Sequence, residues 1–189
     1  MLPTVAQLNH GDLVFRAQLD LARVFVCGHS FGGATALTTV LRWQERGAGQ
    51  GRDDGVRVCG VLVFDPAVDW MPDTERSTLL QAASHAVLPA PTMVVYSDEW
   101  EEKRFGAFEK MRALLQPMDE MQLSGSQDLI PHQLSVIPRT THVCFSDTAF
   151  VLPLWLSRAF GLIGKQADPF ALFAIQDMVV ADWLRRVFP

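Results

Sequence analysis

The chain has 189 residues, of which 49% are hydrophobic and 20% are charged, and this balance predicts one soluble globular domain covering residues 1–189. Its formal net charge of −5 argues against a nucleic-acid partner, because nucleic acids are bound by basic surfaces. The three cysteines, Cys27, Cys59 and Cys144, have neither metal-ligand spacing nor an even number for disulfide pairing. We interpret Cys27 and Cys59 as small buried hydrophobic residues, because each lies within an apolar run.

The start of the sequence bears on the compartment. Residues 1–12 contain neither a basic start nor an apolar core, so no secretory signal is expected. A cytoplasmic location is favoured for the chain as given, and secretion stays open if the N-terminus is truncated. The apolar segment at residues 149–155 contains Pro153 and is too short to span a bilayer.

The first predicted strand is an apolar run at residues 24–27, which leads directly into Gly28-His29-Ser30-Phe31-Gly32. The run does not alternate, which favours a buried strand of a parallel sheet. The five residues match the G-x-S-x-G nucleophile elbow, in which a serine occupies a strained turn between a strand and a helix. Residues 33–43 predict that helix, with an end near Gly47. The alternative is a glycine-rich turn in which Ser30 only caps the helix.

The rest of the chain alternates between strand and helix patterns, whereas residues 1–20 supply no strand. The segments, in chain order, are a loop at residues 48–55, a strand at 56–64, a short helical or irregular stretch at 73–90, a strand at 92–96, a helix at 101–116, a loop at 122–130, a strand at 134–137 and a helix at 169–188 capped by Asp168. This alternation predicts an α/β domain with a mainly parallel sheet and flanking helices.

Four candidate catalytic residues follow the predicted strands: Ser30, Asp65, Asp98 and His142. Catalytic groups in parallel sheets gather at the carboxyl ends of the strands. A serine hydroxyl needs a nearby base at neutral pH, and the base needs an acid that fixes its tautomer. The chain order Ser, Asp, His is the order found in α/β-hydrolases. We therefore expect Ser30 to act as the nucleophile and His142 as the general base.

The identity of the acid is less certain from the residues alone. Asp65 ends a strand sharply and is followed by Pro66, which fixes the next residue. Asp98 ends the next strand, but the acidic residues beside it suggest a solvated turn. Asp69 is a third candidate, with solvent exposure as its ordinary role. We favour Asp65.

Histidines other than His142 are weaker candidates for the base. His142 follows the last strand in a loop that can reach back over the elbow, although such a histidine can also simply cap the next segment. His29 flanks Ser30, and we expect its side chain to point away from that of the serine. His10, His85 and His132 lie in weakly patterned stretches, and we expect them at the surface.

Three segments together resemble the platelet-activating factor acetylhydrolases of the plasma and type II intracellular kind, which are calcium-independent phospholipases A2. They are the run at residues 26–35 (VCGHSFGGAT), the run LVFDPA from residue 62 with Trp70-Met71-Pro72 behind it, and THVCFSDTAF from residue 141. The resemblance extends from about Leu19 to the C-terminus. It implies Ser30 as nucleophile, Asp65 as acid and His142 as base, with no metal and no cofactor. The implied substrates are phospholipids with short or oxidised sn-2 acyl chains.

Two departures from the family pattern affect these expectations. The family has a tighter Asp-Ala-Trp-like run after the acid, so the wall beyond Asp65 should differ here. In addition, the family has a long N-terminal half before the elbow, whereas only about two dozen residues precede the nucleophile strand here. We therefore expect a partial domain without the N-terminal strands, and favour a truncated gene model over a fragment or a degenerate paralogue.

The missing half has two expected consequences. Residues 24–27 should form an uncovered sheet edge. The Phe31 N–H should be the oxyanion donor, and no glycine-rich loop is found to supply a second one.

The leading hypothesis is thus a serine esterase that acts through an acyl-enzyme. The rivals are a catalytically impaired lipid-binding or interaction domain, and an α/β-hydrolase that acts on another ester. A lipid substrate also suggests peripheral contact with a membrane or a lipoprotein surface. Residues 150–156 are the candidate segment, although we favour helix core as their role.

Overall fold

The computed structural model describes residues 19–47, 56–84, 90–103, 132–146, 151–164 and 168–187, together with residues 109, 111, 112 and 115. The elements of these residues are, in chain order, β1 (Val24–His29), α2 (Phe31–Gly47), β2 (Val58–Phe64), η1 (Val68–Trp70), α3 (Asp73–Ser84), β3 (Thr92–Ser97), α4 (Asp98–Lys103), β4 (Gln133–Ile137), η2 (His142–Phe145), α7 (Leu154–Ala159) and α8 (Pro169–Val187).

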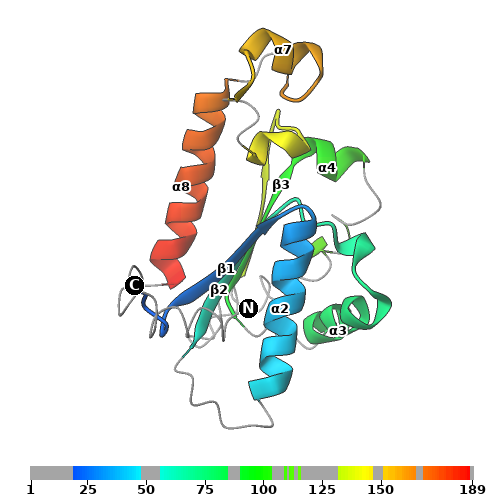
Figure 1. Cartoon of the computed structure of the whole chain (residues 1–189), viewed down its shortest axis with the longest axis vertical. Coiled ribbons are helices and arrows are strands. Elements are labelled where there is room, and N and C mark those ends of the chain that lie inside the picture. The colour runs from blue at the N-terminus through cyan, green and yellow to red at the C-terminus, as the bar shows by residue number, and fades with distance from the viewer. Residues whose placement is uncertain are drawn as a thin grey trace.

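The four strands form one parallel sheet in the order β1-β2-β3-β4 (Figure 1). In the register of β1 and β2, His29 lies opposite Phe64, so the residues that follow each strand, Ser30 and Asp65, emerge at the same edge of the sheet. Among the described residues, β1 pairs with β2 alone and is an edge strand. The predicted parallel sheet is confirmed, and its carboxyl edge collects the candidate residues.

Side chains alternate along the strands and fill a core on each face of the sheet. Val61 and Val63 of β2 point into the core that is covered by α2 and α3, whereas Leu62 and Phe64 point to the opposite face. There they pack in a second core centred on Trp183 of α8, which is fully buried. Figure 1 shows α2 and α8 on the two sides of the sheet. Burial of both faces explains why the strand sequences do not alternate between apolar and polar residues.

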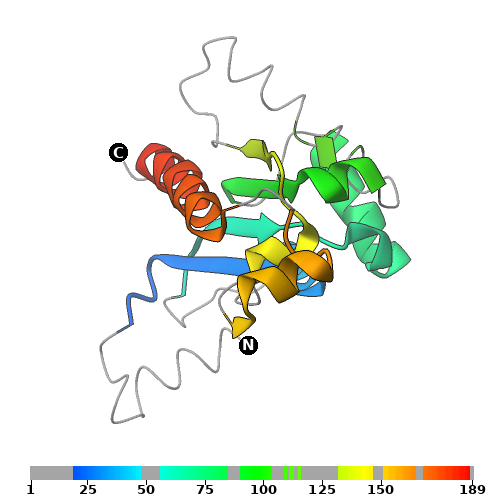
Figure 2. The ribbon, with the colours of Figure 1, turned by 90° about the horizontal axis from the view of Figure 1, so that it is seen from above.

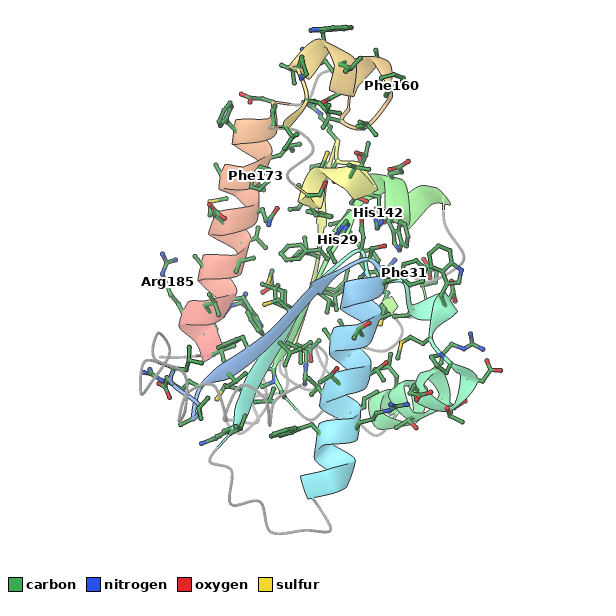
Figure 3. All side chains as sticks on the ribbon, viewed as in Figure 1. His29, Phe31, His142, Phe160, Phe173 and Arg185 are labelled. Atoms are coloured by element: carbon green, nitrogen blue, oxygen red, sulfur yellow. The ribbon has the colours of Figure 1, made fainter. Side chains whose placement is uncertain are left out.

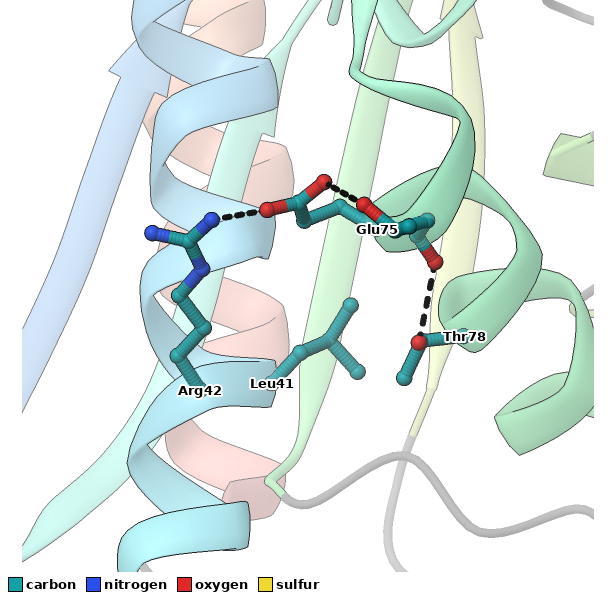
Figure 4. Close-up of a pocket in the computed structure, with 5 residues that line it drawn as sticks. Leu41, Arg42, Glu75 and Thr78 are labelled. Carbon is teal, nitrogen blue, oxygen red and sulfur yellow. Dashed lines mark hydrogen bonds and ion pairs between the residues drawn. The ribbon is translucent and has the colours of Figure 1, made fainter.

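The two helices on the first face are joined by an ion pair. Arg42 of α2 pairs with Glu75 of α3, and Glu75 also accepts a hydrogen bond from the Thr74 hydroxyl (Figure 4). These residues, with Leu41 and Thr78, line a hollow of about 240 Å³ between the helices. The Arg42 side chain is exposed, so the ion pair adds little to the free energy of unfolding.

Several boundaries differ from the prediction. The first strand extends two residues further, to His29, and the second begins at Val58 rather than at residue 56. Residues 73–84 form a regular helix, α3. The helix expected at 101–116 begins three residues earlier, at Asp98, because Ser97 ends β3 and α4 follows without a loop. Most of its predicted remainder lies outside the described residues, as do the loops at 48–55 and 122–130.

Two expectations about burial are wrong. Cys27 is exposed, because β1 is the edge strand of the described sheet. Trp155 of α7, expected in the core, is 71% exposed. None of the described helices is both long and apolar enough to cross a bilayer.

Candidate active site

Ser30 lies on the sharp turn between β1 and α2. Its backbone has φ of 57°, in the left-handed region that side-chain-bearing residues rarely adopt. The Ser30 N–H donates to the carbonyl of Phe64 at 2.9 Å and so continues the β1–β2 pairing, whereas the Ser30 carbonyl accepts from the N–H of Ala34 at 3.2 Å and begins the helix. One residue thus ends the strand and starts the helix, which is the strained geometry that a nucleophile elbow requires.

The two motif glycines of the elbow have different roles. A Cβ on Gly28 would lie 2.1 Å from the backbone carbonyl oxygen of Gly32, which is too close for any side chain at this position. A Cβ on Gly32 would meet nothing within 4 Å. The close passage of strand and helix therefore depends on Gly28, and the space at position 32 is open.

Replacing Gly28 by alanine should lower the free energy of unfolding by about 3 kcal/mol, since the backbone of the elbow has to move to make room. Gly32→Ala is the matched control, and it should leave stability unchanged or raise it by up to about 1 kcal/mol, because alanine favours the helix. Urea unfolding of the two variants measures the difference. Equal stabilities of the two variants would contradict the close approach of Gly28 to the backbone of Gly32.

The structure brings Ser30, His142 and Asp65 together. The Nε2 atom of His142 lies 2.9 Å from the Ser30 Oγ, and its Nδ1 atom lies 3.1 Å from the Asp65 Oδ2. With the proton on Nδ1, His142 donates to Asp65 and presents a free Nε2 lone pair to the serine hydroxyl. The three residues come from the ends of β1 and β2 and from η2, which follows β4.

Asp65 is fully buried and its carboxylate is held by the end of the neighbouring strand. The Ser97 N–H donates to Oδ1 at 2.7 Å, and the Ser97 hydroxyl donates to Oδ2 at 2.6 Å. Its backbone also lies in the left-handed region, with φ of 41°. Ala67 N–H donates to the Ser30 carbonyl at 3.0 Å, which ties the turn after Asp65 to the elbow. Both oxygens of the buried carboxylate therefore accept hydrogen bonds from the end of β3.

The imidazole of His142 is enclosed by two rings. Trp100 stacks on it with ring centroids 4.1 Å apart and an interplanar angle of 18°. The ring of His29 lies beside it with centroids 4.5 Å apart (Figure 3). We expected the His29 side chain to point away from the serine; the structure shows that its ring packs beside the ring of His142. Burial lowers the pKa of His29, and the nearby His142 lowers it further. At neutral pH His29 is therefore an uncharged neighbour.

A metal ion could in principle use atoms of this same cluster. One ligand atom each from His29, Asp65 and His142 lies within 4.8 Å of the others, and two histidines with a carboxylate are suitable zinc ligands. However, Asp65 and the Nδ1 of His142 already hydrogen-bond to each other. That hydrogen bond accounts for the close approach of Asp65 and His142.

A cavity of about 380 Å³ opens over Ser30. It is lined by Ser30, Trp70, Glu99, Trp100, His142, Val143 and Gly161. Trp70 belongs to η1, in the stretch after Asp65 where the sequence departs from the family pattern, and it stacks on Phe31 with ring centroids 4.6 Å apart. The altered stretch thus supplies an aromatic wall of the cavity.

The other candidate acids and histidines have different surroundings. Asp98 is not the solvated turn that was expected, because its carboxylate accepts the N–H groups of Arg139 and Thr140. His132 is buried rather than exposed: its Nδ1 accepts the Thr92 N–H at 3.2 Å, and burial lowers its pKa to about 4. Asp69 lies in η1, and His10 and His85 lie outside the described residues.

Three residues around the site were missed by the sequence reasoning: Ser97, Glu99 and Trp100. The sequence feature that could have indicated these residues is the end of β3. Because β3 pairs with β2, its last residues lie beside Asp65. Asp98, in the middle of this segment, was considered, but only as an alternative acid.

A parallel sheet flanked by helices, with a strand–serine–helix elbow at its carboxyl edge, is the architecture of α/β-hydrolases. The family model described as platelet-activating factor acetylhydrolase, isoform II, matches residues 7–187. The chain belongs to this family. Membership implies, in general terms, a carboxylic ester hydrolase of the acetylhydrolase type with a phospholipid substrate. Comparison with curated proteins gave no match.

Proposed function

We propose that the protein hydrolyses short or oxidised sn-2 acyl esters of phospholipids, with Ser30 as nucleophile, His142 as general base and Asp65 as the acid that orients the histidine. The observation that supports this most is the unbroken chain of contacts from the Ser30 hydroxyl through His142 to the buried carboxylate of Asp65. Nucleophile and base lie within hydrogen-bonding distance, and the base is oriented by a third group, as covalent catalysis by serine requires.

The first half of the reaction would transfer the acyl group to the enzyme. As Ser30 Oγ attacks the sn-2 carbonyl carbon, its proton passes to His142 Nε2, and the carbonyl oxygen becomes an oxyanion. The Phe31 N–H, at the start of α2, is the proposed donor to that oxyanion. When the intermediate collapses, the bond to the glycerol oxygen breaks and this oxygen takes the proton from His142. The lysophospholipid leaves, and the acyl group remains on Ser30.

The second half of the reaction would release the acid. A water molecule gives a proton to His142 Nε2 and attacks the acyl carbon, and collapse of the second intermediate returns the proton to Ser30 Oγ. The cavity of about 380 Å³ is near the lower end of the range for ligand pockets, roughly 300–1,000 Å³. A small cavity favours a short acyl chain over a long one.

The direct test is hydrolysis of a choline phospholipid with an sn-2 acetyl group, compared with the same lipid carrying a long sn-2 chain. The proposal predicts release of acetate and a much lower rate with the long chain. A neutral acetyl ester of a simple alcohol serves as the control for esterase activity as such. Hydrolysis of the neutral ester alone would favour an α/β-hydrolase for another ester, and hydrolysis of neither would contradict catalysis by this chain.

We also propose that the end of the molecule near η2 contacts a lipid surface. Four strongly exposed apolar residues lie there, on α7, just before and just after it, and at the start of α8: Val151, Trp155, Phe160 and Phe170, with exposures of 70–75%. We call them the apolar cap. Figures 1 and 2 show α7 at the same end as the strand ends that carry the site. Aromatic side chains favour the interface between membrane and water.

Trp155→Ala should weaken co-sedimentation with zwitterionic liposomes about tenfold, equivalent to about 1.4 kcal/mol, because a large part of the cap's apolar area is lost. The matched control is Met178→Ala, which also removes an exposed apolar side chain but in the middle of α8. Equal binding of Trp155→Ala and the wild type, with the fold intact, would exclude the cap as the contact surface.

A further inference from the structure

The backbone before His142 is held by the first turn of α4. The carboxylate of Asp98 accepts the N–H of Arg139 at 2.5 Å and that of Thr140 at 2.8 Å. The carboxylate of Glu99 accepts the N–H of His142 itself at 2.9 Å. We call Asp98 and Glu99 the carboxylate clamp. Two adjacent acidic side chains thus take three N–H groups of one four-residue loop.

This loop has a conformation that needs support. Arg139 has φ of 62°, in the left-handed region that costs a side-chain-bearing residue roughly 1–2 kcal/mol. Hydrogen bonds from N–H groups to a carboxylate are about twice as strong as those between neutral groups. The bonds to Asp98 are therefore suited to hold the strained turn that aims the chain from β4 towards the site.

The same turn of α4 also contacts the catalytic side chains. The Trp100 N–H donates to the Ser97 hydroxyl at 3.2 Å, and that hydroxyl donates to Asp65. The Trp100 ring, 5% exposed, covers one face of the His142 imidazole. Residues 97–100 therefore contact the acid through Ser97, the imidazole through Trp100 and the backbone of the base through Glu99.

We propose that Asp98 and Glu99 are positioning residues for His142: they fix the histidine's backbone so that its ring spans the gap between Asp65 and Ser30. The ring contacts both partners at hydrogen-bonding distance, 3.1 Å and 2.9 Å, so a shift of the loop breaks one contact or both. A misplacement of about 1 Å costs on the order of a hundredfold in rate. This inference rests on the proposed role of His142 as general base.

Asp98→Ala should lower kcat/KM for the acetyl ester about a hundredfold, mainly through kcat, because Asp98 does not line the substrate cavity. Glu99→Ala should lower kcat by a similar factor and should also raise KM, because Glu99 lines that cavity. Glu99→Gln should retain activity within about threefold, since the amide oxygen still accepts the His142 N–H. The matched control is Glu101→Ala, an exposed glutamate on the same helix, with wild-type activity expected. Wild-type rates in both alanine variants would overturn the proposal, as would equal losses in Glu99→Ala and Glu99→Gln.

A second readout does not depend on turnover. The proton on His142 Nδ1, bonded to Asp65, should give a low-field proton NMR signal that is missing in His142→Gln. The clamp predicts that this signal is lost or broadened in Asp98→Ala and Glu99→Ala and kept in Glu99→Gln and Glu101→Ala. An unchanged signal in both alanine variants overturns the clamp, even if the wild type proves inactive. An inactive wild type whose signal follows the predicted pattern would count against the proposed function alone.

Discussion

Ser30→Ala should abolish ester hydrolysis, with kcat/KM falling on the order of 10⁴- to 10⁶-fold while the protein remains folded. The serine hydroxyl is the group that would form the bond to the acyl carbon, and no other hydroxyl occupies its place on the elbow. Loss of one partly exposed hydrogen bond to His142 should change the free energy of unfolding by about 1 kcal/mol at most. The measurement is steady-state kinetics with the acetyl ester, alongside urea unfolding.

The control for this variant is Ser77→Ala, which removes an exposed serine hydroxyl on α3. It should match the wild type in both rate and stability. Turnover that persists in Ser30→Ala would mean that Ser30 only caps α2, and the acyl-enzyme mechanism would be wrong.

Asp65→Asn should lower kcat about 10⁴-fold, as removal of the acid's charge does in a serine triad. The reason lies in the hydrogen-bond donors that surround the Asp65 carboxylate. The Ser97 N–H occupies Oδ1, so the amide oxygen should take that place and the NH₂ group should replace Oδ2. The NH₂ group then faces His142 Nδ1 and can only donate to it. The imidazole proton is displaced to Nε2, where it blocks acceptance of the Ser30 proton.

The same substitution also tests which carboxylate is the acid. Asp69→Asn removes the charge of one of the alternative acids, four residues further on in η1, and should keep kcat within a few-fold of the wild type. A large loss in Asp69→Asn with little change in Asp65→Asn would reverse the assignment. Because Asp65 is fully buried beside the Ser97 hydroxyl, Asp65→Asn should also lose stability, by about 1–3 kcal/mol.

The elements nearest the elbow could be predicted from the sequence because their signals are local. The apolar runs of β2 and β3 contribute to the cores on both faces of the sheet, and β1 packs Val26 against one core and Phe25 against the other. The glycine at position 28 is required by a contact only four residues away. A parallel sheet then places every strand's carboxyl end at one edge. That is why the sequence alone predicts Ser30 and Asp65 close together.

The environment of His142, the proposed base, could not be predicted in this way. The clamp joins Asp98 to Thr140, 42 residues apart, and the acidic run that carries it has the composition of a solvated turn. Similarly, His132 has no local pattern that indicates burial, yet it accepts a hydrogen bond from Thr92, 40 residues away. Such contacts depend on how loops meet after the sheet has formed.

The exposure of the apolar cap also depends on tertiary structure and could not be predicted from the sequence. Residues 150–156 have the composition of a core helix, but no described element covers Trp155, and its side chain is 71% exposed. Likewise, Cys27 lies in an apolar run but on the edge strand. An apolar sequence predicts burial only where another element is present to bury it.

The most direct test of the central claim is the site of reaction with an organophosphonate ester, located by mass spectrometry. An activated serine attacks phosphorus and keeps the phosphonyl group, whereas a structural serine does not react. We predict a single phosphonyl group on Ser30 in the wild type, and labelling at least a hundredfold slower in His142→Gln. No label on the wild-type chain, or a label on another residue, would contradict the assignment of Ser30 as a nucleophile activated by His142.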